Sequence, residues 1–205
     1  EDVSDQSKFS FVFTEESGVK LKQRELDSLV DYEDLNCRVS FVGSPKVELR
    51  GSSTKDYLVR FIDKATKQDV FTSSISSGHW CVANRKYFTD WEIQVELENK
   101  LVYSYTFNVS DQKVLVSFGS KSLGDTLAWI PYIEEFAHKH SCHVSVSTFW
   151  NSLFKKEYPD IDFIEPGGVV KDVYASYEIG CLDDDMGIMH KEDWRTIPLQ
   201  KVAAD

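Results

Sequence analysis

A single carboxylate follows a short loop between a buried apolar run and an amphipathic segment. The apolar run covers residues 114–118, the loop covers 119–124, and Asp125 comes directly after it. A carboxylate at the start of a helix can cap backbone N–H groups that lack partners, which is worth about 0.5–2 kcal/mol. It can also act as a general base that accepts a proton from an attacking hydroxyl. The residue type and position leave both roles open.

The glycine spacing of this loop resembles a nucleotide-binding pattern, but the loop lacks the lysine that such a pattern requires. Gly119 and Gly124 stand five residues apart before the expected helix. A phosphate-binding P-loop needs a lysine directly after the second glycine, to contact the β- and γ-phosphates. Asp125 occupies that position and would repel them. A G-x-G dinucleotide fingerprint is also absent, so both kinds of nucleotide site are excluded.

Six residues at the expected site of Asp125 are candidates for substrate binding, and four of them have a structural alternative. They are Lys121, Ser122, Gly124, Thr126, Trp129 and Trp150. Lys121 can contact a phosphate or remain a solvated loop lysine, and Thr126 can cap the helix or line the site. The indoles of Trp129 and Trp150 can stack on a sugar or an acceptor peptide, or they can pack in the core.

Histidine, cysteine and acidic residues give no metal-binding pattern. His138, His140, Cys142 and His143 straddle an expected helix end and strand start, and their spacing matches no zinc motif. The aspartates at 183–185 are best interpreted as an acidic surface loop. The four cysteines, Cys37, Cys81, Cys142 and Cys181, are widely spaced, which predicts reduced thiols in a cytoplasmic protein and no bound metal.

Strands and helices alternate in the second half of the chain. Apolar patterning predicts strands at 114–118, 143–148, 161–164 and within 173–182, and helices at 125–140 and 150–157. The apolar face of the first helix is expected to consist of Leu127, Ile130, Ile133 and Phe136. Such alternation is typical of a parallel sheet, which binds ligands outside the carboxyl ends of its strands. The loop at 119–124 lies at such an end.

The first half shows only strand patterning. Alternating apolar residues predict strands at 8–14, 38–42, 45–50, 57–63, 69–73, 91–98 and 101–109. Tight turns are expected at Gly43-Ser44 and Asn99-Lys100. We therefore predict an α+β protein with an all-β sandwich or small barrel at 8–110, a boundary near 110–112, and an α/β Rossmann-like domain at 113–205.

Composition limits the classes of function. The chain has 205 residues, of which 41% are hydrophobic, and a formal net charge of -11 that is spread over both halves. An acidic chain has little electrostatic affinity for nucleic acid. No segment approaches the roughly 18 apolar residues of a membrane span, and no signal peptide is recognisable.

Several segments together resemble a known family. They include 119–154, YPDIDFIEPG, YASYEIGC, DWRTIPLQKVAAD and the preceding TKDYLVRFIDK and ANRKYFTDWEIQV. This combination is similar to the bacterial autotransporter heptosyltransferases, which attach heptose to serine hydroxyls of autotransporter adhesins. The resemblance implies a GT-B glycosyltransferase, in which two Rossmann-like domains face each other after a small β domain. It also implies an ADP-heptose donor, an autotransporter-like acceptor, and Asp125 as the general base of an L-G-D motif.

The resemblance also predicts what this chain lacks. We expect the donor-binding domain and the family's cysteine-bound iron to lie beyond residue 205, so that residues 1–205 alone are inactive. The first residue is glutamate, and 198–205 resembles the opening of a helix, which favours a fragment. The alternative is a non-enzymatic module whose β domain binds a partner protein. The sugar, the acceptor and the oligomeric state are left open.

Overall fold

The fold is built mainly from strands. The structure, a computed structural model, describes residues 19–20, 35–85, 87–179 and 200. The strands in these residues are β1 (Val19–Lys20), β2 (Asn36–Val42), β3 (Lys46–Arg50), β4 (Asp56–Asp63), β5 (Gln68–Ser76), β6 (Trp80–Val82), β7 (Trp91–Leu97), β8 (Lys100–Thr106), β9 (Lys113–Phe118), β10 (His143–Ser147), β11 (Asp162–Phe163) and β12 (Ala175–Ile179). The helices are α1 (Leu123–His140) and α2 (Asn151–Phe154).

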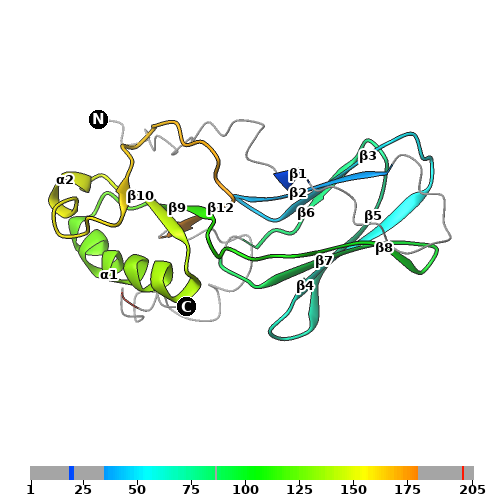
Figure 1. The fold of residues 1–205 in the computed structure, drawn as a ribbon, viewed down its shortest axis with the longest axis horizontal. Helices are drawn as coiled ribbons and strands as arrows, with labels where there is room; N and C mark the ends of the chain where they lie inside the picture. The colour runs from blue at the N-terminus through cyan, green and yellow to red at the C-terminus, as the bar shows by residue number, and fades with distance from the viewer. Residues whose placement is uncertain (1–18, 21–34, 86, 180–199, 201–205) are drawn as a thin grey trace, which may run out of the picture.

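One mixed sheet runs through most of the molecule (Figure 1). Its strand order is β11-β10-β9-β12-β2-β3-β6, and β1 pairs with β2 at one side. The strands from β11 to β2 are parallel to their neighbours, as predicted for the second half, whereas β2, β3 and β6 are antiparallel. The parallel contact between β12 and β2 aligns Ala175 with Phe41 and Ser176 with Val42. The sheet therefore crosses the predicted boundary near 110–112.

A second, antiparallel sheet has the order β5-β4-β7-β8. Every second residue of β7 is buried, from Trp91 to Leu97, as expected for a strand with one face in the core. The turn between β7 and β8 consists of Glu98 and Asn99, which both have positive φ. This geometry is that of a two-residue hairpin, so the turn lies one residue earlier than predicted.

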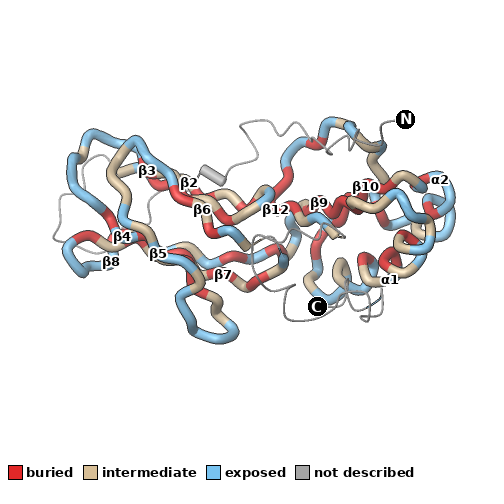
Figure 2. The backbone as a smooth tube through the Cα atoms, turned by 180° about the vertical axis from the view of Figure 1, so that it is seen from behind, coloured by how far each residue is buried: buried red, intermediate tan, exposed pale blue. Residues whose placement is uncertain are grey.

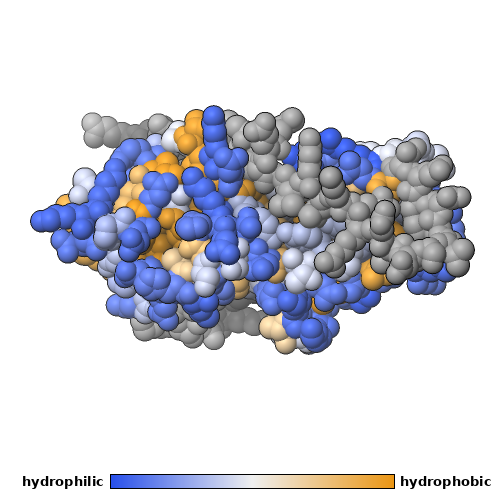
Figure 3. Space-filling model, in the orientation of Figure 1, coloured by the Kyte–Doolittle hydropathy of each residue, from blue (hydrophilic) through white to orange (hydrophobic). Residues whose placement is uncertain are grey.

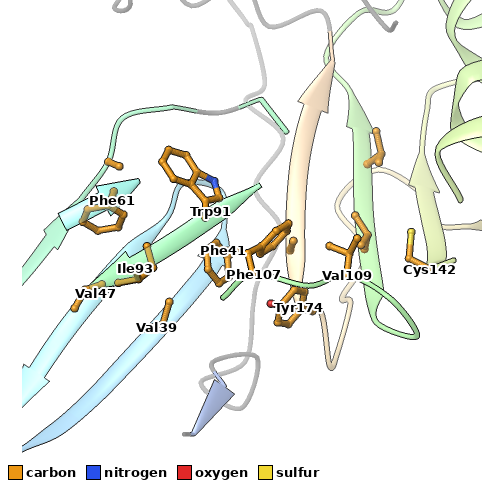
Figure 4. Packing of buried hydrophobic residues seen from close by; sticks show 14 of the residues in the cluster. Val39, Phe41, Val47, Phe61, Trp91, Ile93, Phe107, Val109, Cys142 and Tyr174 are labelled. Carbon is orange, nitrogen blue, oxygen red and sulfur yellow. The ribbon is translucent and has the colours of Figure 1, made fainter. Parts of the chain in front are cut away.

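Aromatic rings fill the space where the two sheets meet (Figure 4). The ring centroid of Phe41 lies 4.5 Å from that of Phe107 and 5.8 Å from that of Tyr174. The hydroxyl oxygens of Tyr105 and Tyr174 are 2.8 Å apart, and the Asn108 backbone N–H donates to Tyr174 at 3.1 Å. One hydrophobic cluster contains most buried apolar residues of both halves, and a smaller cluster consists of Leu115, Val170 and Val173. The division at residue 110 stays a prediction.

Helix α1 covers one face of the parallel strands, where buried residues concentrate (Figure 2). Its buried residues are Thr126, Trp129, Ile130 and Ile133. The prediction of Leu127 in this face was wrong, since its side chain is 56% exposed. The buried stripe begins instead at Thr126, whose hydroxyl donates to the Ser122 carbonyl at 3.1 Å. A polar residue can be buried when its hydrogen bond is made to the neighbouring backbone. The buried face of α1 therefore includes a threonine, which apolar patterning does not detect.

Other elements differ in extent from their predictions. Strand β6 was not predicted, and α2 is a single turn rather than a helix over 150–157. The expected strand at 8–14, the aspartates at 183–185, Cys181 and most of 198–205 lie outside the described residues. Strands dominate the described part of the chain, so a complete α/β Rossmann-like domain is not confirmed by it.

Polar residues occupy most of the surface that Figure 3 displays for the described part of the chain. Apolar residues show between them in the region of the parallel strands. No described helix is long and apolar enough to cross a bilayer.

Candidate functional site

Two loops meet at the carboxyl-terminal edge of the parallel strands. The loop 119–122 follows β9, and the loop 148–150 follows β10, which is paired with β9 in parallel from Lys113–His143 to Ser117–Ser147. On the other side of β9, the Gly119 N–H donates to the Ile179 carbonyl at the end of β12, at 2.9 Å. The predicted loop therefore lies at the edge where parallel sheets bind ligands.

Ser122, and not Asp125, caps helix α1. Ser122 has extended backbone angles, and its Oγ accepts a hydrogen bond from the Asp125 N–H at 3.3 Å. This is the usual N-cap arrangement, in which a side-chain oxygen satisfies a free N–H of the first turn. Helix α1 thus begins at Leu123, two residues before its predicted start. Because Ser122 performs the capping role, the Asp125 carboxylate is not needed for it.

The Asp125 carboxylate is half-buried and is held by Ser120. Ser120 Oγ donates to Asp125 Oδ2 at 2.5 Å, and it accepts a hydrogen bond from the Ser122 N–H at 3.1 Å. None of the salt bridges between described residues includes Asp125. The contact with Ser120 was missed from the sequence, although a serine five residues before a helical aspartate was visible there.

Lys121 and Trp150 connect the two loops. The Trp150 indole Nε1 donates to the Lys121 carbonyl at 2.9 Å, and the Lys121 ammonium lies 5.3 Å from the centroid of the Phe149 ring. Lys121 is exposed, and Trp150 keeps 37% of its surface exposed. Both residues are therefore accessible, and the hydrogen bond between them connects the two loops.

A buried hydrogen-bond network shapes the loop after β10. Asn151 Oδ1 accepts hydrogen bonds from the Thr148 N–H at 2.9 Å and from the Thr148 hydroxyl at 3.0 Å. Asn151 Nδ2 donates to the Ile164 carbonyl at 2.8 Å. Neither Thr148 nor Asn151 was a predicted site residue. The T-x-x-N spacing after a strand is the pattern that could have indicated this turn.

The structure separates the remaining candidates. Thr126 is completely buried, and Trp129 is 3% exposed, with its ring 5.5 Å from that of Phe118 in an edge-on contact. Packing occupies the surfaces of both side chains, and their role as ligand contacts stays a prediction. Gly124 is exposed and lies within α1, and a Cβ added there would meet Ser122 Oγ at 3.6 Å, apart from its chain neighbours and the helix backbone.

The cysteines behave as buried thiols. Cys37, Cys81 and Cys142 are unpaired and buried. Burial raises the pKa of Cys37 to about 12, with a further contribution from Cys81, and burial raises the pKa values of Cys81 and Cys142 to about 11. The described residues contain no group of three or more His, Cys, Asp or Glu that could hold a metal ion.

Sequence comparison finds relatives of one kind. The chain is 33% identical over 127 residues to the autotransporter heptosyltransferase BAHTCr of Citrobacter rodentium, which covers 60% of this chain and 31% of the relative. It is 32% identical over 127 residues to TibC of Escherichia coli, with the same coverage. The chain resembles the amino-terminal portion of the autotransporter heptosyltransferases. The resemblance predicted from the sequence motifs is thereby confirmed. No protein-family model matches the chain.

The likeness to the heptosyltransferases extends to their fold. The solved structure of TibC, a bacterial iron-containing dodecameric glycosyltransferase, matches with a TM-score of 0.70 and 24% identity over 89% of this chain. That match covers 48% of TibC, and the chain spans about a third of the curated heptosyltransferases. A third relative, BimC of Burkholderia thailandensis, is 30% identical over 128 residues, covers 61% of this chain and 30% of the relative, and is named an inactive heptosyltransferase.

Proposed function

We propose that this chain is part of a glycosyltransferase that moves heptose from ADP-heptose to serine hydroxyls of an autotransporter-type protein. The similarity to BAHTCr and TibC supports the class of enzyme. A solved TibC complex with ADP-D-β-D-heptose supports the donor. The acceptor follows from the names of these relatives, which associate heptosyl transfer with autotransporters.

The proposal includes a GT-B architecture. Residues 8–110 would form the β domain and residues 113–205 part of the first Rossmann-like domain. The parallel β9-α1-β10 unit supports this assignment, since such a unit is the repeating element of α/β sheets. The donor would be held mainly by a second domain, and the iron described for TibC would belong to residues outside those described here.

In this proposal Asp125 is the general base. The Asp125 carboxylate takes the proton of the acceptor serine hydroxyl while the serine oxygen bonds to the anomeric carbon of heptose. The bond from that carbon to the ADP oxygen breaks, and its electron pair leaves with ADP. Attack opposite the leaving group inverts the anomeric configuration. The observation that carries this role is the half-buried Asp125 carboxylate at the carboxyl edge of the parallel strands. Ser122 caps the helix, so this carboxylate is not used as the cap.

The other site residues bind and orient in this scheme. Lys121 offers an exposed ammonium that can pair with a donor phosphate, and the exposed part of the Trp150 indole can stack on the acceptor. The Ser122 cap and the N–H groups at Gly124 belong to the positive end of α1, which favours negative charge nearby.

Replacement of Asp125 by Asn in the complete protein tests this proposal. The variant keeps the shape but cannot accept the proton, so kcat should fall by about 10²–10⁴-fold. Transfer is measured by intact-mass spectrometry of an autotransporter adhesin incubated with ADP-D-β-D-heptose, and donor binding by calorimetry. Asp162→Asn is a matched control, because Asp162 also accepts a serine hydroxyl, from Ser145, but lies on β11. Normal transfer by Asp125→Asn would refute the base assignment.

The second candidate function is a non-enzymatic module that binds a protein partner. The name of BimC, an inactive heptosyltransferase of similar identity, favours keeping this alternative. In that case the unmodified complete protein would bind the adhesin but add no mass to it. Heptosyl addition by the unmodified protein would exclude the alternative.

The location and assembly belong to the same proposal. Cys37, Cys81 and Cys142 are free thiols, which is typical of a reducing compartment such as the cytoplasm. TibC is described as dodecameric, so self-association of the complete protein is proposed as well.

A further inference from the structure

We infer that Ser120 is a positioning residue for Asp125: its hydroxyl holds Oδ2 and leaves Oδ1 to receive the proton of the acceptor. This inference rests on the proposed function, because it assigns how the proposed base is oriented. Ser120 lies outside the L-G-D motif, because it precedes the first residue of that motif by three positions.

The hydrogen bonds of Ser120 fix the direction of its proton. A serine hydroxyl has one proton to donate and two lone pairs to accept. The Ser122 N–H donates to Ser120 Oγ at 3.1 Å and thus uses an acceptor position. The Ser120 proton therefore points to Asp125 Oδ2, 2.5 Å away, with a carboxylate as acceptor. These two successive hydrogen bonds, from the Ser122 N–H to the Ser120 hydroxyl and from that hydroxyl to the Asp125 carboxylate, fix the orientation of the Ser120 hydroxyl.

The backbone around Ser120 is anchored on both sides. Gly119 donates to the Ile179 carbonyl of β12, and the Lys121 carbonyl accepts from Trp150. Ser120 is itself half-buried. A positioning group can orient a catalytic side chain only if it is held more firmly than that side chain. The two anchors satisfy this condition and connect Ser120 to the strands on either side of β9.

The two carboxylate oxygens of Asp125 are consequently not equivalent. Oδ2 is engaged by Ser120, whereas within the described residues no hydrogen bond is made to Oδ1. With Oδ2 fixed, rotation of the carboxylate is restricted and Oδ1 keeps one direction. A base that is already oriented reaches the attacking hydroxyl without losing rotational freedom in the transition state, which appears as a higher kcat.

The test compares Ser120→Ala with Ser120→Thr in the complete protein. We expect Ser120→Ala to lower kcat for heptosyl transfer by about 10-fold or more, with the KM for ADP-D-β-D-heptose changed less than about twofold. Ser120→Thr keeps the hydroxyl and should remain within about threefold of the unmodified kcat. If Ser120 had a purely structural role, Ser120→Ala would lower stability without lowering kcat selectively over KM. Ser120→Thr would then not restore kcat.

Ser145→Ala provides the matched control for the loss of a Ser–Asp hydrogen bond. Ser145 Oγ donates to Asp162 Oδ2 at 3.1 Å on neighbouring parallel strands, away from the site loop. Its kcat should be unchanged, while thermal unfolding reports the structural cost of each variant.

Two results would overturn the inference. One is a folded Ser120→Ala variant with kcat within twofold of the unmodified protein. The other is an equal loss in the alanine and threonine variants, which would show that the hydroxyl is not the relevant group. Parallel measurement of Asp125→Asn separates the two proposals, because an inactive Asp125→Asn with a normal Ser120→Ala refutes only the positioning role. If the unmodified protein transfers no heptose, both proposals are refuted.

Discussion

The indole N–H of Trp150 donates a hydrogen bond to the backbone carbonyl of Lys121 at 2.9 Å. These residues are 29 positions apart in the sequence and lie in the loops after two adjacent parallel strands, β9 and β10. The bond connects the loop that carries Ser120 with the loop built on Thr148 and Asn151. The edge where we place the chemistry is therefore one connected unit.

Replacement of Trp150 by Phe should loosen this edge. The substitution keeps an aromatic ring but removes the donor to Lys121, so the free energy of unfolding should fall by about 0.5–1.5 kcal/mol. Amide exchange of residues 119–122 should accelerate, as measured by hydrogen–deuterium exchange. Leu153→Ala is the control, because Leu153 is 54% exposed and its loss should stay within about 0.5 kcal/mol. Unchanged exchange in Trp150→Phe would contradict a connecting role.

Two substitutions at the start of α1 should change the stability of the protein in opposite directions. Ser122→Ala removes the N-cap oxygen and should destabilise the protein by about 1 kcal/mol. Gly124→Ala adds a methyl group with no contact closer than 3.6 Å, in a helix, so it should stabilise by up to about 0.5 kcal/mol. Urea unfolding followed by circular dichroism measures both. Stabilisation by Ser122→Ala would show that the helix does not begin where the structure places it.

The tyrosine pair at the junction of the sheets should respond unequally to loss of its hydroxyls. Tyr174→Phe leaves both the Tyr105 hydroxyl and the Asn108 N–H without their partner, and should cost about 1–3 kcal/mol. Tyr105→Phe leaves the Asn108 bond intact, so its cost should be smaller. Burial raises the pKa of Tyr174, which keeps this phenol neutral. Equal losses in urea unfolding would argue against Tyr174 as the centre of the contact.

The buried thiols predict a fall in stability at alkaline pH. Burial raises the pKa of Cys37 to about 12 in the folded protein, whereas an unfolded thiol titrates near about 8.5. The stabilisation is therefore complete below about pH 8.5 and is lost as the pH rises toward 12, because only the unfolded state loses its proton there. Between pH 9 and pH 10 the unfolding free energy should fall by roughly 1 kcal/mol from this thiol.

Cys37→Ala supplies the comparison for this pH dependence. It should have lower stability at pH 8 because it leaves a small cavity, but a shallower decline from pH 9 to pH 10 than the unmodified protein. Urea unfolding at fixed pH values measures both slopes. An identical slope in the variant would show that Cys37 is not shielded from water.

The sequence by itself determined the local features of this protein. Alternation of apolar residues located β4 and β7, and the run 114–118 followed by a glycine-bounded loop located β9 and the site edge. Asp125 after Gly124 was enough to exclude a P-loop, because that exclusion depends only on a charge at one position. The combination of motifs was enough to predict the heptosyltransferase resemblance. The strand positions and the resemblance are confirmed, and both depend on neighbours in the chain.

Only the tertiary structure decided which distant segments meet. The pairing of β12 with β2 places Ala175 beside Phe41 and joins the two halves, and no local pattern specifies that register. The burial of Thr126 in place of Leu127 depends on the orientation of α1 about its axis relative to β9 and β10. Apolar patterning does not reveal it, because Thr126 is polar. The Ser120 hydrogen bond to Asp125 depends on a loop conformation fixed by Ile179 and Trp150. Each of these contacts is set by packing between residues far apart in sequence, which propensity and spacing do not encode.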